Sequence, residues 1–404
     1  MSPPDLSTQP WLTDPDVQAV MDAIEAAGGQ VRFVGGCVRN ALIGAPVDDV
    51  DIATTLIPDH VVKALTNAGL RSAPTGLAHG TVTAIASGRG FEVTTLRRDV
   101  TTDGRNATVA FTDDWADDAA RRDFRLNAIY ADRRGRIFDS TGQGVADALT
   151  GRIIFVGDPE TRIREDYLRI LRFFRFLAWY GKGAPDEGGL RACAALKAGM
   201  ARLSAERIEK ELMKLLAAPD PRPAMRAMAD SGVLTVILPE AVAGALFEAT
   251  VGLTRDPIVR LSVLVPADAS VVAAVSRRLR FPNATLARLT AAAGALSSVS
   301  LEMTEAQTRE AVYRHGRRAT EDALYRRWSE DPARSTDAGH RLTLTAAWEP
   351  PPLPVSGRDL ARLGVERGPR VGRILKAFEE GWIQDDFPDA GHMARLRAAV
   401  LATG

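Results

Sequence analysis

Cysteine is scarce in this sequence, and the two that occur, Cys37 and Cys193, lie far apart. Two distant cysteines form neither a disulfide framework nor a cysteine-rich zinc pattern. Apolar runs are also short, and none reaches the roughly 18 residues that a membrane-spanning helix requires. The N-terminal residues include prolines and acids instead of the basic start and apolar run of a secretion signal. We therefore expect a cytoplasmic protein with no membrane association.

The chain also lacks an excess of charge of either sign, because 51 Lys and Arg residues balance 51 Asp and Glu residues. No overall basic field favours nucleic acid, so any RNA site must be a local basic surface. The 46% hydrophobic and 25% charged residues are typical of globular proteins, and 404 residues suggest two to four domains.

Short β-rich runs alternate with helical stretches through the first 150 residues. Hydrophobic periodicity predicts strands at 31–34, 50–54, 81–86, 91–96 and 136–139, and helices at 58–68 and 114–131. After residue 156 the strand signals fade and helical periodicity continues to the end. The fold class expected is an α/β N-terminal part followed by an all-α remainder, with breaks near 182–189, 219–223 and 350–354.

Asp49 and Asp51 are separated by one residue, so on an extended strand both carboxylates project from the same face. Carboxylate oxygens are suitable ligands for Mg²⁺, and a pair of them can serve two-metal phosphoryl transfer. Taken alone, the pair also fits a polar turn before a strand. Glu92, on a neighbouring predicted strand, is either a third carboxylate for the same site or a solvent-facing acid.

A glycine turn precedes this pair. Gly35 and Gly36 follow the strand at 31–34, and residues 37–44 are predicted to form a short helix. Such a turn lets backbone N–H groups approach phosphate oxygens at a helix N-terminus, and Arg39 is then placed to clamp a triphosphate. The alternative is a tight turn with a solvated arginine.

The string Gly35-Gly36-Cys-Val-Arg39, followed by Asp49-Val-Asp51, resembles the head motif of the class II tRNA nucleotidyltransferase and bacterial poly(A) polymerase family. The resemblance implies a mixed-sheet head of the DNA polymerase β type, with Asp49 and Asp51 as catalytic metal ligands. It implies Mg²⁺ as the metal, with Mn²⁺ as the alternative.

Further matches follow in the family's order. Residues 121–128 resemble the second motif, which implies that Arg122, Asp123 and Asn127 bind the nucleotide, and residues 138–149 resemble a hinge between head and neck. Residues 165–176 resemble the helix on which Asp166 and Arg169 read the incoming base, so that the protein itself serves as the template. The nucleotide-binding residues expected are therefore Gly35, Gly36, Arg39, Arg122, Asp123, Asn127, Asp166, Arg169 and Arg172.

On a helix, Asp166 and Arg169 would share a face, and Glu165 would orient the arginine. The alternative is an ordinary helical ion pair with Arg172 and Arg175 solvated. Residues 204–212 resemble the helix that braces the neck, where Arg207 and Glu211 are expected to form an i, i+4 pair.

The resemblance implies four parts: a nucleotidyltransferase head at 1–150, a base-recognising helical neck at 151–218, and an RNA-binding helical body and tail at 219–350 and 351–404. Two positions depart from the family pattern. Asn40 replaces the usual Asp, which keeps hydrogen-bonding size without charge. Arg125 replaces a usual Thr, which leaves ribose recognition open.

Within the family, the segment 97–109 resembles the flexible loop of A-adding members, and a Gly-Arg-Arg-Phe type poly(A) polymerase signature is missing after the neck. The leading hypothesis is CCA addition to tRNA from CTP and ATP. Poly(A) polymerase or A-adding activity is the alternative, and a tRNA-binding protein without activity is the non-enzyme alternative. The tRNA is expected on basic stretches at 162–164, 277–280 and 314–318, and no protein partner is evident.

Overall fold

The computed structural model describes residues 5–77, 80–103 and 106–403, with side chains described throughout except at 75 and 99–109. The chain divides into two compact units, Met1–Pro239 and Glu240–Gly404. Each unit is a separate body of packed elements. The four-part division into head, neck, body and tail stays a prediction.

The first unit is built on a mixed seven-stranded sheet with the order β3-β4-β5-β2-β1-β8-β9. Its neighbouring strands are antiparallel except for the parallel pair β2 and β5. The strands are β1 (Val31–Val34), β2 (Ile52–Thr54), β3 (Arg71–Gly76), β4 (Thr81–Ala86), β5 (Arg89–Thr95), β8 (Ile129–Ala131) and β9 (Ile137–Asp139). The expected α/β head with a mixed sheet is confirmed.

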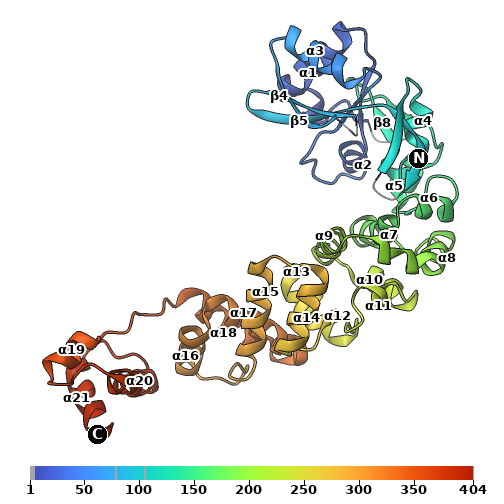
Figure 1. Ribbon diagram of the computed structural model, residues 1–404. Helices are drawn as coiled ribbons and strands as arrows, with labels where there is room; N and C mark the ends of the chain where they lie inside the picture. Colours follow the sequence, from blue (N-terminus) through green and yellow to red (C-terminus); the bar gives the residue numbers. More distant parts are fainter. Residues whose placement is uncertain (1–4, 78–79, 104–105, 404) are drawn as a thin grey trace. The chain divides into compact units, whose positions relative to one another are not determined.

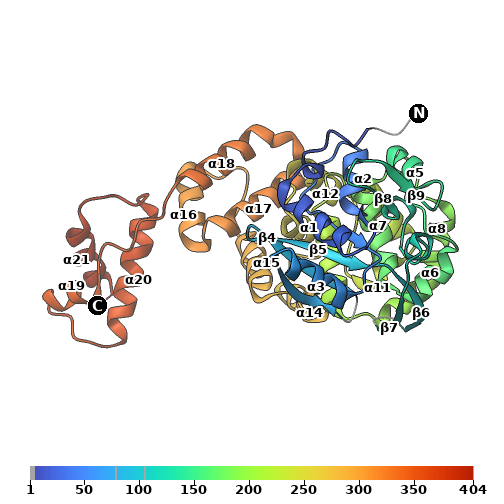
Figure 2. The same ribbon diagram turned by 90° about the horizontal axis from the view of Figure 1, so that it is seen from above.

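Two helices, α1 (Pro15–Ala26) and α3 (Pro58–Asn67), cover one face of the sheet over β4 and β5 (Figures 1 and 2). Each begins with proline at its first helical position, where the missing N–H costs nothing. The alternation Thr-Val-Thr-Ala-Ile-Ala buries every second residue of β4, which directs its apolar side chains into this layer.

Several predicted elements are corrected in the structure. The helix predicted at 114–131 is wrong: α4 (Trp115–Ala120) ends early and is followed by a 3-10 turn (Arg125–Asn127) and strand β8. The β-branched and aromatic residues of β8 pair with β1, and this pairing overrides the local helical pattern. The segment 97–109, expected as a flexible loop, contributes a separate β-hairpin of β6 (Arg97–Asp103) and β7 (Asn106–Phe111). Residues 104–105 at its turn lie outside the described residues.

The remainder of the first unit is helical: α2 (Gly36–Leu42), α5 (Gly144–Thr150), α6 (Pro159–Glu165), α7 (Leu168–Tyr180), α8 (Glu187–Leu196), α9 (Ala205–Leu216), α10 (Arg222–Asp230) and α11 (Val233–Ile237). Helix α7 joins the core next to the sheet because Phe173 stacks on Phe155 with ring centroids 5.6 Å apart, and Phe155 contacts Phe124 at 4.9 Å. All three rings are fully buried. This aromatic cluster ties α7 to the segment that carries the second motif.

The second unit contains helices α12 (Ala245–Leu253), α13 (Pro257–Leu264), α14 (Ala269–Leu279), α15 (Asn283–Ala295), α16 (Glu305–His315), α17 (Arg317–Glu330), α18 (Ser335–Ala347), α19 (Gly357–Arg362), α20 (Pro369–Gln384) and α21 (His392–Ala402). One apolar core lies among α15 to α18 and another among α19 to α21. Within the described ranges no single helix is long and apolar enough to cross a bilayer. Only α13 and α14 pass that test together, and they are bent by 119°.

Candidate active site

The turn after β1 is formed by Gly35, which has φ +71° and ψ −116° and precedes the first residue of α2. Side chains disfavour this backbone conformation, and a Cβ at Gly35 would lie 3.7 Å from Arg122 Nη1. The Gly35 amide donates to the Ile129 carbonyl at 3.2 Å, so it is already used within the fold. The Gly36 amide opens α2, where first-turn N–H groups lack intrahelical acceptors, and it is the better phosphate donor of the two.

The carboxylate pair lies just before β2 and not within it, because β2 begins at Ile52. The predicted strand at 50–54 is therefore too long by two residues. Pairing nevertheless extends to this segment, since the Val34 amide donates to the Asp51 carbonyl at 3.0 Å. The parallel register of Ile52 with Val93 sets Asp51 beside Glu92.

Asp49, Asp51 and Glu92 line one open pocket of about 570 Å³. Burial raises the pKa of Asp51, and the negative charges of Glu92 and Asp49 add to this effect while Arg122 opposes it. Glu92 is therefore close enough to act on Asp51 electrostatically. The hypothesis of a third carboxylate from a neighbouring strand agrees with this geometry.

The donor chemistry of this pocket suits a hard divalent cation. Among the described residues, no group of three or more His, Cys, Asp or Glu side chains is arranged to enclose a metal ion. Carboxylates on one side of an open pocket suit an ion such as Mg²⁺, which keeps water and substrate phosphate oxygens among its ligands. The residues therefore fit a metal that completes its coordination with substrate.

Arg122 is held by a buried carboxylate that the sequence analysis missed. Asp118 accepts from Arg122 at 2.9 Å, from Arg121 at 2.6 Å and from the Tyr130 hydroxyl at 2.7 Å. The Arg122 Nε also donates to the Tyr130 oxygen at 3.2 Å. The spacing of Asp118 three and four residues before the two arginines was the available signal.

Arg39 is buried, with 6% of its surface exposed, and its guanidinium contacts neutral acceptors. Nη1 donates to Asn127 Oδ1 at 2.5 Å, and Nη2 donates to Asn40 Oδ1 and the Tyr180 hydroxyl, both at 2.8 Å. Asn40 thus keeps a hydrogen-bonding role without charge, as expected. Burial lowers the pKa of Arg39, and Tyr180 and Asp123 oppose that effect. Its clamping of a triphosphate stays a prediction.

Asp123 connects this network to α7. Its carboxylate accepts from Arg172 Nη2 at 2.5 Å and from Asn127 Nδ2 at 3.1 Å. Burial would raise the pKa of Asp123, but the Arg172 guanidinium and the Asn127 amide lower it below its ordinary value. Three predicted nucleotide-binding residues, separated by up to 49 positions, are therefore in direct contact. Arg172 is ion-paired, which contradicts the alternative of a solvated side chain.

Asp166 and Arg169 do not share one helix, which corrects the predicted arrangement. Asp166 ends α6 with φ −152° and ψ 107°, and α7 begins at Leu168. The Asp166 carboxylate accepts from the Leu168 amide at 3.0 Å and from Arg207 at 2.6 Å. Glu165 contacts Arg169, as predicted, and Arg169 Nη2 also donates to the Arg121 carbonyl at 3.0 Å.

The expected i, i+4 pair of Arg207 and Glu211 is wrong. Arg207 contacts Asp166, and Glu211 accepts from Arg175 Nε at 2.5 Å. Both residues of α9 therefore pair across to the α6–α7 region. The partners of the two residues are Asp166, which follows α6, and Arg175 of α7.

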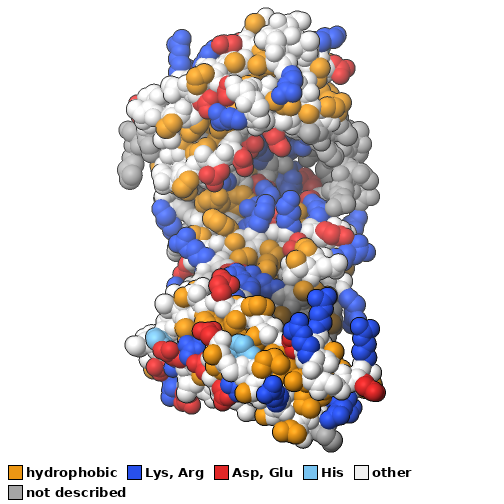
Figure 3. Space-filling view, turned by 90° about the vertical axis from the view of Figure 1, so that its left-hand side faces the viewer, with side chains coloured by type: hydrophobic (Ala, Val, Ile, Leu, Met, Phe, Trp, Pro, Cys, Tyr) orange, Lys and Arg blue, Asp and Glu red, His pale blue; other side chains and the backbone are white. Residues whose placement is uncertain are grey.

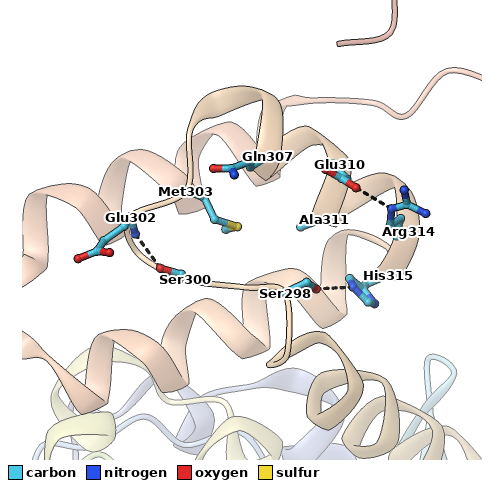
Figure 4. Close-up of a pocket in the computed structure, with 9 residues that line it drawn as sticks. All are labelled: Ser298, Ser300, Glu302, Met303, Gln307, Glu310, Ala311, Arg314 and His315. Carbon is cyan, nitrogen blue, oxygen red and sulfur yellow. Dashed lines mark hydrogen bonds and ion pairs between the residues drawn. The ribbon is translucent and has the colours of Figure 1, made fainter. Parts of the chain in front are cut away.

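A second pocket, of about 420 Å³, lies in the second unit between α16 and the segment before it (Figure 4). Its charged residues are paired: Arg314 contacts Glu310 at 2.8 Å and Glu380 at 2.5 Å. His315 contacts the Ser298 hydroxyl at 2.7 Å. This pocket offers no carboxylate pair beside a glycine turn, so the candidate active site is the pocket with Asp49 and Asp51.

The three predicted RNA-binding stretches are largely engaged in ion pairs. Arg164 contacts Glu160 at 2.6 Å, Arg278 contacts Glu240 at 2.5 Å and Arg317 contacts Glu349 at 2.6 Å, with further pairs at Arg162, Arg314 and Arg318. In Figure 3, basic side chains lie in separate groups interspersed with acidic ones. RNA binding through these stretches stays a prediction.

Two family models match parts of the chain. Residues 31–154 match the poly A polymerase head domain, and residues 186–243 match the probable RNA and SrmB-binding site of polymerase A. The first match contains the glycine turn, the carboxylate pair and the second motif. The second covers α8 to α11.

Named relatives match over most of their lengths. The chain is 33% identical to CCA tRNA nucleotidyltransferase 1, mitochondrial, of Mus musculus, over 87% of this chain and 82% of that protein. It is 31% identical to the CCA-adding enzyme of Levilactobacillus brevis, over 92% and 94% of the respective lengths. The crystal structure of the Bacillus stearothermophilus CCA-adding enzyme in complex with CTP matches with a TM-score of 0.79 and 26% identity, covering 96% of this chain and 99% of that one.

Proposed function

Because this chain belongs to the class II family of CCA-adding tRNA nucleotidyltransferases and bacterial poly(A) polymerases, we propose that it adds CCA to the 3′ end of tRNA from CTP and ATP. The full-length relatives are named for CCA addition, and a structural neighbour was solved with CTP. The poly(A) polymerase alternative is not favoured by these names. The chain is therefore a nucleotidyltransferase.

One observation in particular supports this proposal. The carboxylates of Asp49, Asp51 and Glu92 share a pocket, and Arg122 acts electrostatically on Asp51 from the second motif. A non-catalytic tRNA-binding protein has no need of a carboxylate site beside a glycine turn. The arrangement is the one expected for transfer of a nucleotidyl group.

In the proposed reaction, the 3′-hydroxyl oxygen of tRNA attacks the α-phosphorus of CTP or ATP. A new P–O bond forms, the bond between the α-phosphorus and the oxygen that bridges it to the β-phosphorus breaks, pyrophosphate leaves, and the proton of the attacking hydroxyl is released to solvent. Nucleotidyltransferases of this family generally depend on a divalent metal, and we propose Mg²⁺, with Mn²⁺ as the alternative, on Asp49 and Asp51. When bound, such ions neutralise phosphate charge and favour ionisation of the attacking hydroxyl.

The protein's own contribution is positioning and charge. We propose that the Gly36 amide, Arg39 and Arg122 bind the triphosphate. Asp123 and Asn127, which form a hydrogen-bond network with Arg172, are proposed to bind the ribose of the nucleotide. Gly35 provides the turn. Asp166 and Arg169 are proposed to read the base, since an ionised carboxylate has about four lone-pair sites and a guanidinium five N–H donors.

The RNA is proposed to contact the helical body and tail. In the second unit, Arg370, Arg373 and Lys376 recur every three residues along α20, and Arg358 and Arg367 lie in or near α19 and the start of α20. These five side chains are exposed, and within the described part of the chain none forms an ion pair. Such unpaired cations suit phosphate contacts. A cytoplasmic location remains our prediction.

The first test replaces each proposed metal ligand with its amide. Asp49→Asn and Asp51→Asn keep side-chain size but remove the charge that a divalent ion requires. Each is expected to lower incorporation of labelled CMP and AMP into a tRNA lacking its 3′ end by at least about 1,000-fold, because positioning of the phosphoryl groups is lost. Circular dichroism and thermal unfolding should match the unchanged protein.

Asp59→Asn, an exposed acid on α3, is the matched control and should leave incorporation within about twofold. Retained turnover in either Asp49→Asn or Asp51→Asn would reject the assignment of the carboxylate pair. Long A tails from ATP with little use of CTP would instead indicate polyadenylation. No incorporation by the unchanged protein with Mg²⁺ or Mn²⁺, despite tRNA binding, would indicate a binding protein.

A further inference from the structure

The Arg39 guanidinium is a buried cation that lacks a direct carboxylate partner in the described structure. Its contacts are the side-chain oxygens of Asn40, Asn127 and Tyr180. Neutral acceptors satisfy the N–H donors but carry no negative charge, and Asp123 acts on the guanidinium electrostatically without a direct hydrogen bond to it. A buried site of this kind favours an anionic ligand nearby, so the residues that fix this guanidinium influence how strongly the anion binds.

Tyr180, the last residue of α7, provides one of these oxygens and also contacts Arg39 through its ring. Its hydroxyl oxygen accepts from Arg39 Nη2 at 2.8 Å, and the Arg39 guanidinium carbon lies 4.1 Å from the centre of its ring. The second distance is within the range of a cation–π contact. Tyr180 therefore restrains the guanidinium both at its edge and over its face.

The position of Tyr180 is itself fixed by packing. Its ring contacts Phe176 one turn earlier, with centroids 5.5 Å apart, and Arg172 on the same helix contacts Asp123. Asp123 in turn accepts from Asn127, which also holds Arg39. Helix α7 thus reaches Arg39 by two routes, one through Tyr180 and one through Arg172, Asp123 and Asn127.

We propose that Tyr180 is a positioning residue for nucleotide binding: it holds the Arg39 guanidinium at the glycine turn and couples that cation to helix α7. This inference rests on the proposed function, in which Arg39 binds the triphosphate. Because Tyr180 is uncharged, it orders the arginine without neutralising it. The triphosphate is common to CTP and ATP, so Tyr180 affects both nucleotides equally and does not select the base.

The test distinguishes the contribution of the Tyr180 hydroxyl to nucleotide binding from that of its ring. Tyr180→Phe removes the acceptor and keeps the aromatic face, whereas Tyr180→Leu removes both. Dissociation constants for CTP and for ATP are measured by equilibrium dialysis, together with KM and kcat for each nucleotide. Tyr180→Phe is expected to weaken both nucleotides about three- to tenfold, the range for loss of one hydrogen bond, and Tyr180→Leu to weaken them further.

The KM for tRNA and the kcat at saturating nucleotide should change by less than about twofold in Tyr180→Phe, because neither the attacking end nor the carboxylates are altered. Tyr313→Phe is the matched control. It loses one tyrosine hydroxyl bond, to Glu379 at 2.7 Å in the second unit, and should leave both nucleotide constants unchanged.

Unchanged CTP and ATP binding in Tyr180→Phe would overturn the proposal. So would a lower melting temperature with reduced kcat and unaltered nucleotide binding, because that pattern indicates a structural role only. Failure of the proposed function is distinguishable: the unchanged protein would then add no CMP or AMP to tRNA, whereas the dialysis measurement still reports whether Tyr180 affects nucleotide binding.

Discussion

Asp118 illustrates how a single buried side chain organises the candidate site. It has 1% of its surface exposed, yet it accepts hydrogen bonds from two arginines and one tyrosine. Burial alone would raise the pKa of Asp118, but the Arg122 and Arg121 guanidiniums and the Tyr130 hydroxyl lower it to about 2. The carboxylate is therefore the anchor that places Arg122 beside Asp51.

We predict that Asp118→Asn lowers both stability and activity. A folded-state pKa lowered from 3.8 to about 2 corresponds to about 2 kcal/mol of stability, which is present above the unfolded-state value and lost as the pH falls toward the folded-state value. Urea unfolding of the unchanged protein and the variant should differ most at pH 7, and the difference should narrow as the pH falls from 5 to 3.

Asp113→Asn, an exposed acid just before α4, serves as the control and should change the unfolding free energy by less than about 0.5 kcal/mol. A difference between Asp118→Asn and the unchanged protein that stays constant from pH 7 to pH 3 would contradict the assigned direction of the pKa change. The KM for CTP should rise in Asp118→Asn because Arg122 loses its anchor.

At the scale of elements, the break between α6 and α7 determines what the proposed base-reading residues contact. Asp166 is extended, so its carboxylate caps the Leu168 amide and pairs with Arg207 of α9. Arg175 of α7 likewise pairs with Glu211 of α9. Helix α9 is thus joined by ion pairs to the α6–α7 junction and to α7. It therefore supports the region that carries Asp166 and Arg169.

The β6–β7 hairpin is an element whose removal should separate the two nucleotide activities. It forms its own two-stranded sheet and shares no strand with the seven-stranded sheet, and at its base the Thr112 amide donates to the Leu96 carbonyl at 3.0 Å. Replacing residues 98–110 with a two-glycine turn is expected to retain CMP addition and to reduce AMP addition at least about tenfold, as the family resemblance implies.

The measurement uses labelled ATP with a tRNA ending in CC, and labelled CTP with a tRNA lacking all three nucleotides. Loss of both activities with an altered melting temperature would mean that the hairpin supports the fold of the first unit. Undiminished AMP addition would show that A addition does not require this element.

At the scale of the whole molecule, a formal net charge of zero is combined with local basic surface. Most arginines of the stretches at 162–164, 277–280 and 314–318 form ion pairs with acidic side chains. Among the described residues, the cations along α20 form no direct ion pair, and Lys376 acts on Glu380 only through its charge. We therefore expect RNA phosphates to contact α20 more than those stretches, since ion-paired arginines contribute less to phosphate contacts than unpaired ones.

We predict that replacing Arg370, Arg373 and Lys376 together with alanine raises the KM for tRNA at least about tenfold and leaves the KM for CTP unchanged. If all three contact phosphates, the slope of log binding constant against log salt should fall in magnitude by about two to three. Filter binding across a salt series gives this slope.

Lys63→Ala removes an exposed cation of α3, outside the residues that match the RNA-binding family model, and it should leave tRNA binding unchanged. An unaltered salt slope in the triple variant would place the RNA elsewhere. All variants are full-length proteins, so nucleotide addition by the first unit is measured in the same samples as tRNA binding.

The sequence by itself determined the features that depend on neighbours along the chain. The strands at 31–34 and 81–86, the helix from Pro58 and the turn at Gly35 follow from local periodicity, from proline at a helix start and from the freedom of glycine at positive φ. The spacing of Asp49 and Asp51 and the order of motifs identified the family for the same reason.

Only the tertiary structure decided which groups meet. Arg39 and Tyr180 are 141 positions apart, and Arg172 and Asp123 are 49 apart, so no local rule pairs them. The helix predicted at 114–131 became partly a strand because pairing with β1 outweighs helical propensity. Arg207 and Glu211 do not form the predicted i, i+4 pair, because packing provides each with a partner on another element. Residues far apart in sequence come into contact only when the helices and strands pack together, so local sequence patterns do not predict these contacts.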